Sequence, residues 1–110
     1  MVRIGSVILN VRDVKRGAAF WRSALGYVSP ERNPAIVAPE SGDGVYLLLD
    51  ADDRSHVDLH ADSYQEQQSE VERLLSLGAT RPEWSYPPDA DFVVLADPDG
   101  NLFCIIDTSH

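Results

Sequence analysis

An internal repeat restricts the folds open to this chain more than any other feature of its sequence. The pair Leu25-Gly26 recurs as Leu77-Gly78, an offset of 78 − 26 = 52, which is close to half of the 110 residues. Each pair ends a segment with helical spacing of apolar residues, and each such segment follows a stretch in which polar and apolar residues alternate. We therefore predict two similar halves, residues 1–53 and 54–110, built in the same order.

The first half is predicted to begin with a strand over 6–11 and a helix over 14–25. Asp13 is suited to the N-cap of this helix, and Gly26 to its left-handed C-cap. Three shorter extended segments are predicted around 27–29, 35–38 and 45–49, separated by turns rich in proline and glycine. The residues expected on the apolar stripe of the helix are Val14, Ala18, Trp21 and Leu25. Phe20 and Trp21, on or next to this stripe, are expected in the core and not in a ligand site.

The second half repeats this order. A strand is predicted over 56–61, then a helix that begins after a cap at Asp62 or Ser63 and reaches Leu77-Gly78. An extended segment over 81–86 and strands over 92–96 and 102–106 follow. The last two are joined by a tight turn at 97–101, where Pro98 fixes φ and Gly100 tolerates a positive φ.

Size and charge limit the classes of protein that this chain can belong to. A length of 110 residues with 44% hydrophobic residues is the usual size of a single domain. A net charge of −9 disfavours nucleic acid and anionic lipid as partners. No apolar run approaches the ~20 residues of a membrane span and no signal peptide is recognisable, so the cytoplasm is the expected location.

Several short motifs, taken in order, resemble one known family over nearly the whole chain. They are Val11-Arg12-Asp13, Phe20-Trp21, Leu25-Gly26, the run from His56 to Asp62, the turn Asp97-Pro98-Asp99-Gly100-Asn101, and Phe103-Cys104. The chain is similar to the glyoxalase, bleomycin resistance and dioxygenase proteins of the vicinal oxygen chelate superfamily. This resemblance implies an α+β fold of two tandem βαβββ modules, which form a partly open barrel with helices outside and a ligand cleft inside. It also implies a homodimer.

The resemblance identifies the positions at which related proteins hold a metal ion. They fall at Ser6, near Leu48, at His56 and at Cys104, and only His56 is a regular ligand type for its position. We therefore expect no bound metal and no other cofactor. Cys104 is the single cysteine, so it has no internal disulfide partner; as a thiolate it could bind zinc, but a small, partly buried side chain is the simpler interpretation.

The segment from His56 to Ala61 has a polar face. His56, Asp58 and His60 alternate with apolar residues, so all three point to one side of the predicted strand. They either line a ligand cleft, with Asp58 orienting a histidine, or form the solvated side of a sheet. Trp84 and Tyr86 could provide flat stacking surfaces, or cover the edge of the core or a dimer contact.

Three functions are compatible with these features. The leading hypothesis is a protein that binds a small organic ligand without metal; its expected ligand-binding residues are Ser6, Tyr46, Leu48, His56, Asp58, His60, Trp84, Tyr86 and Cys104. The first alternative is a metal-dependent lyase, isomerase or dioxygenase of the same superfamily. The second is an interaction module without an active cleft.

Overall fold

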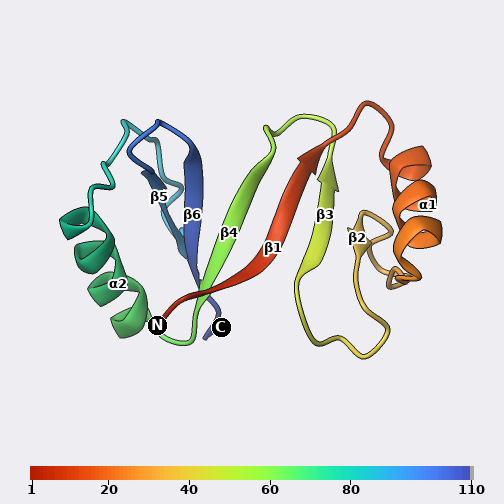
Figure 1. Cartoon of the computed structure of the whole chain (residues 1–110), viewed down its shortest axis with the longest axis horizontal. Helices are drawn as coiled ribbons and strands as arrows, with labels where there is room; N and C mark the ends of the chain where they lie inside the picture. The colour runs from red at the N-terminus through yellow and green to blue at the C-terminus, as the bar shows by residue number, and fades with distance from the viewer. Residues whose placement is uncertain (110) are drawn as a thin grey trace. The chain divides into compact units, whose positions relative to one another are not determined.

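The computed structural model describes residues 1–109, which form two compact units. One contains residues 5–55, and the other contains residues 1–4 together with 56–109. The elements, drawn in Figure 1, are β1 (Arg3–Asn10), α1 (Val14–Leu25), β2 (Ile36–Val37), β3 (Tyr46–Asp50), β4 (His56–Ala61), α2 (Tyr64–Ser76), β5 (Phe92–Ala96) and β6 (Leu102–Asp107). Within residues 1–109, neither helix has the length and apolar character that a membrane span requires.

In the unit of residues 5–55, β1 pairs with β3 in parallel and β2 pairs with β3 antiparallel. The predicted ends of α1 are confirmed: the Asp13 carboxylate accepts a hydrogen bond from the Arg16 amide at 3.1 Å, and Gly26 adopts φ 69°. Ala18 on α1 is buried against Val37 and Leu49 of the sheet. The core of this unit therefore lies between α1 and one face of its strands.

Three predictions for this unit are wrong in detail. The segment 27–29 is reduced to a single bridge between Val28 and Ala38. Phe20 and Leu25, expected in the core, are 62% and 45% exposed. Successive residues of an α-helix are about 100° apart around its axis, so Phe20 and Trp21 cannot both face the core. Trp21 packs against the core, and the exposed Phe20 ring contacts it in a T-shaped arrangement, with ring centroids 5.1 Å apart.

In the second unit, β4 pairs with β6 in parallel and β5 pairs with β6 antiparallel. Helix α2 packs on one face of these strands through a core of Ala61, Val71, Leu95 and Ile105. Ser63, one of the two predicted caps, accepts a hydrogen bond from the Glu66 amide at 3.0 Å. Unit by unit, the order strand, helix, bridge, strand, strand is the same, so the predicted α+β repeat is confirmed.

The connections in this unit differ in how well the sequence predicted them. The turn at 97–101 forms as predicted, with Gly100 at φ 87° and the Asp97 carboxylate accepting from the Asn101 amide at 2.8 Å. Among residues 1–109, the segment 81–86 pairs with no strand, and a bridge joins the preceding Thr80 to Ala96. Pro82 lacks the amide hydrogen that a strand ladder needs, which explains the interruption.

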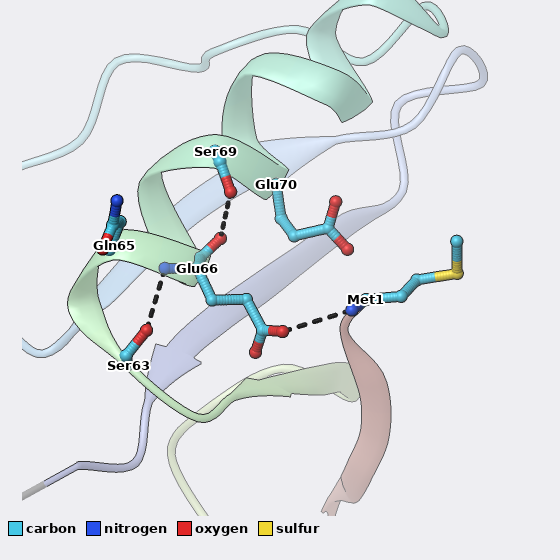
Figure 2. Close-up of a pocket in the computed structure, with 6 residues that line it drawn as sticks. All are labelled: Met1, Ser63, Gln65, Glu66, Ser69 and Glu70. Carbon is cyan, nitrogen blue, oxygen red and sulfur yellow. Dashed lines mark hydrogen bonds and ion pairs between the residues drawn. The ribbon is translucent and has the colours of Figure 1, made fainter.

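The first residues of the chain are bound to α2. The Met1 amino group lies 3.1 Å from a Glu66 carboxylate oxygen, an ion pair visible in Figure 2. The Val2 amide donates to Glu70 at 2.7 Å, and Arg3 pairs with Asp62 at 2.9 Å. These contacts are the reason that residues 1–4 belong to the unit formed by the second half.

Candidate functional site

Three chemically reactive side chains converge on the face of β4 and β6 that points away from α2. The Nε2 atom of His56 lies 3.3 Å from a carboxylate oxygen of Asp58. Potential ligand atoms of His56, Asp58 and Cys104 all lie within 4.8 Å of one another. The side chains of His56 and Asp58 are only 10% and 11% exposed. An imidazole, a carboxylate and a thiol therefore share one site that is largely shielded from bulk water.

Strand register explains why these residues meet although they are distant in sequence. In β4, Leu59 and Ala61 point into the α2 core, so His56, Asp58 and His60 point to the opposite face. Asp58 is the Cα partner of Cys104 in the parallel β4–β6 pairing. The cluster is thus held by the backbone ladder of two regular strands.

The same face continues across β6 to β5. Cys104 is the Cα partner of Val94, and Ile106 is the partner of both His60 and Phe92. Residues that are partners across neighbouring strands lie on one face of a sheet. Val94, Phe92 and Ile106 therefore extend the polar cluster with an apolar surface. These three residues were not among the predicted ligand-binding residues, although alternation along the predicted strands could have indicated them.

His60 lies on the same face of β4, two residues after Asp58. Its pKa is lowered from the ordinary histidine value by burial, and further by the positive charge of Arg3, while the Asp58 carboxylate acts in the opposite direction. A lowered pKa keeps the imidazole neutral at pH 7. A neutral imidazole offers one hydrogen-bond donor and one acceptor, so His60 is suited to an uncharged polar group.

The two aromatic residues of the 81–86 segment have different surroundings. The Tyr86 hydroxyl accepts a hydrogen bond from the Val94 amide at 2.8 Å, and its ring lies 5.5 Å from the ring of Phe92. Tyr86 thus borders the apolar part of the β5–β6 face. Trp84 is 46% exposed and lines an open surface hollow with Glu83 and Ser85.

The remaining expected ligand-binding residues belong to the other unit. Ser6 is 1% exposed and is the Cα partner of Tyr46 in the β1–β3 pairing. Leu48 is the partner of Ile8 on one side and Ile36 on the other. All three expected residues lie on the face of this unit opposite the α1 core. Six of the nine expected residues are therefore in the second unit, and three of those six form the close cluster.

Two other hollows differ from the cluster in their chemistry. Figure 2 shows an open groove lined by Met1, Ser63, Gln65, Glu66, Ser69 and Glu70. Its carboxylates are already paired, Glu66 with the Met1 amino group and Glu70 with Arg73. A second hollow, beside the start of α1, is lined by Val11, Arg12, Asp13, Arg16, Gly17 and Phe20. Neither brings together a histidine, a carboxylate and a thiol.

The residues present match the superfamily's metal positions only in part. Of the four positions, Leu48 has no donor atom and Ser6 has a weak neutral hydroxyl, so the four-ligand arrangement does not fit this chain. His56 and Cys104 do lie together, and Asp58 adds a carboxylate to them. Among residues 1–109, these three form the group that could hold a metal ion.

Comparisons with known proteins identify the family of this chain. A family model described as a glyoxalase-like domain matches residues 6–106. A solved structure of a glyoxalase/bleomycin resistance protein/dioxygenase superfamily member from Vibrio splendidus 12B01 is similar, with 17% identity, a TM-score of 0.56, and coverage of 97% of this chain and 99% of that chain. A glyoxalase-related enzyme from Fulvimarina pelagi is 21% identical, with a TM-score of 0.41 and coverage of 96% and 88%. No curated protein sequence gives a significant match.

Proposed function

Because this chain belongs to the glyoxalase-like domain family, we propose that it binds a small organic ligand on the face of β4, β6 and β5 that carries His56, Asp58 and His60. The observation that carries the proposal is the close contact of His56 with Asp58 beside Cys104, with the His56 and Asp58 side chains only 10% and 11% exposed. Family membership confirms the resemblance noted in the sequence.

The polar groups of this face favour a ligand with hydrogen-bonding oxygen or nitrogen atoms. The Asp58 carboxylate can accept hydrogen bonds from a hydroxyl or amide group, and a neutral His60 can donate to a carbonyl or accept from a hydroxyl. Removal from water strengthens these electrostatic interactions. A ligand that leaves a buried polar group of the site without a hydrogen bond would bind more weakly, by about 1–3 kcal/mol for each such group.

The apolar groups favour a flat or aromatic part in the same ligand. Ile106 and Phe92 continue the face from His60, and the Tyr86 ring stands against Phe92. Ring contacts of this kind contribute about 0.5–1.5 kcal/mol beyond burial of their area. We propose that Trp84 of the same unit adds to the ligand contacts. Ser6, Tyr46 and Leu48, on the face of their own unit opposite α1, remain predicted ligand-binding residues. The ligand class is thus an aromatic or cyclic compound that carries a carbonyl or hydroxyl group.

A library of such compounds, screened by thermal shift on protein treated with a chelator, tests this proposal. A ligand at 100 times its dissociation constant should raise the free energy of unfolding by ~2.7 kcal/mol. Asp58→Asn should weaken any ligand found, because the amide replaces a carboxylate of nearly the same shape. Gln65→Ala, in the groove of Figure 2, is the control and should bind as the wild type does. Ligands whose affinity is unchanged by Asp58→Asn would disprove the placement of the site.

A second candidate function, a metal-dependent lyase, isomerase or dioxygenase, is favoured by the His56, Asp58 and Cys104 cluster. A divalent ion held there would act as a Lewis acid on a carbonyl or hydroxyl oxygen of the ligand. His60, neutral and on the same face, would then be placed to exchange a hydrogen bond with that ligand. Turnover that requires added metal and is lost in Cys104→Ser would favour this candidate over simple binding.

A homodimer is also part of the proposal. Phe20 on α1 and Tyr64 on α2 are large apolar side chains that are more than 60% exposed, and a contact between two chains could remove them from water. Two copies with a net charge of −9 repel each other, so the contact has to be largely apolar. Light scattering at moderate salt should give twice the mass of one chain, and a single-chain mass would contradict the dimer.

A further inference from the structure

The cluster on β4 and β6 has the geometry of a metal site contained within one half of the chain. We infer that His56, Asp58 and Cys104 bind one divalent ion of the zinc class, with the fourth position open to water or to a ligand. This inference deepens the second candidate function, because it names the class of ion and its protein ligands, and it requires no organic ligand. It also differs from the four positions implied by the superfamily, since Asp58 is not among them and Ser6 and Leu48 contribute nothing.

The distances support this assignment. Zinc lies ~2.0–2.3 Å from nitrogen, oxygen and sulfur donors, so two donors of a tetrahedral site are roughly 3.3–3.8 Å apart. His56 Nε2 and the nearer Asp58 oxygen are 3.3 Å apart, and all three donors lie within 4.8 Å. The widest donor separation therefore has to shorten by about 1 Å at most to reach the spacing of a tetrahedral zinc site.

The backbone and the surroundings favour a preformed site. The donors stand on two strands whose register pairs Asp58 with Cys104, so their Cα positions are fixed by the sheet. The His56 and Asp58 side chains are nearly buried, which excludes most of the water that would compete for the ion. Only the short side chains have to be ordered on binding, so little conformational entropy is lost.

The donor types select the ion. An imidazole nitrogen, a carboxylate oxygen and a sulfur together suit zinc, whereas magnesium and calcium take sets made up of oxygen. In the part of the chain that the structure describes, His56, Asp58 and Cys104 each offer one such ligand atom to the cluster. Three protein ligands with an open fourth position are typical of zinc sites that bind or activate a further molecule.

Binding also balances charge. The Cys104 thiol releases its proton to solvent as the sulfur–zinc bond forms, and the ion gives up coordinated water to the three donors. One thiolate and one carboxylate then neutralise the two positive charges of the ion. A neutral, shielded site avoids the cost of burying unpaired charge.

Cobalt(II) alone, added to protein stripped with a chelator, is the probe for this site. We expect a thiolate-to-cobalt charge-transfer band and intense tetrahedral d–d bands that saturate at one ion per chain, and their displacement by zinc. Excess magnesium or calcium should not displace the cobalt. Absence of the thiolate band at saturating cobalt would overturn the inference without any variant being needed.

Matched variants separate a designed site from incidental binding. Cys104→Ser should abolish the charge-transfer band. Asp58→Asn should weaken zinc by at least ~10-fold, because even residues that only support a ligand contribute 10–100-fold. Asp99→Asn makes the same chemical change on an exposed turn and should leave the affinity unchanged. Equal zinc affinity in all three proteins would overturn the site, whereas the ligand screen on chelator-treated protein would still decide the proposed function separately.

Discussion

Leu95 in β5 offers the clearest test of how the face of the second unit is held in place. Its side chain is 0% exposed and forms the core under α2 together with Ala61, Val71 and Ile105. Leu95→Ala removes three carbon atoms, worth about 0.8 kcal/mol each in transfer free energy, and leaves a cavity that raises the total to ~3–4 kcal/mol. That loss is large against the 5–15 kcal/mol typical of a domain.

Urea unfolding followed by tryptophan fluorescence and circular dichroism measures this change. The midpoint should fall with little change in the slope, because the surface exposed on unfolding stays nearly the same. Leu77→Ala is the matched control: the same atoms are removed from a side chain that is 66% exposed, and the change should stay within about 0.5 kcal/mol. A loss below ~1 kcal/mol for Leu95→Ala, or equal losses in the two variants, would refute the packing described here.

Three further predictions concern local contacts. Hydrogen bonds from Arg73, and then from the Val2 amide, lower the pKa of Glu70. The ionised carboxylate therefore stabilises the fold above the pKa that Glu70 has in the unfolded chain, and this contribution is lost as the pH falls through the folded-state pKa. Glu70→Gln should thus flatten the acid side of the stability profile measured by thermal unfolding. Tyr86→Phe removes the acceptor for the Val94 amide and should lower the free energy of unfolding in urea by ~1 kcal/mol, and an unchanged value would contradict the importance of this hydrogen bond. Gly26→Ala should cost ~1–2 kcal/mol by the same measurement, since φ is 69°, and a neutral result would contradict the left-handed cap.

The elements that depend on local chemistry were predictable from the sequence. The cap at Asp13, the stop at Gly26 and the turn at 97–101 each rest on a few neighbouring residues, and all three have the predicted geometry. Predictions that depended on tertiary packing were less successful. The position of Phe20 is decided by which neighbouring aromatic ring fits over the sheet, and helical spacing alone does not decide between Phe20 and Trp21.

The candidate site was accessible from the sequence only in part. Alternation along 56–61 places His56, Asp58 and His60 on one face, because that periodicity is a property of a single strand. The approach of Cys104 to Asp58 depends on the register of two parallel strands that are far apart in the chain. Register of this kind is set by the whole sheet, so no local pattern in the sequence indicates that Cys104 lies beside Asp58 and His56.

Amide NMR spectra of the chelator-treated protein, recorded during the small-molecule screen, test most directly whether β4, β6 and β5 carry the ligand site. We predict that a ligand shifts the amides of His56, Asp58, His60 and Cys104 and those of their neighbours on β5. Shifts confined to the groove between Ser63 and Glu70, or to the hollow beside Arg12 and Phe20, would contradict this assignment.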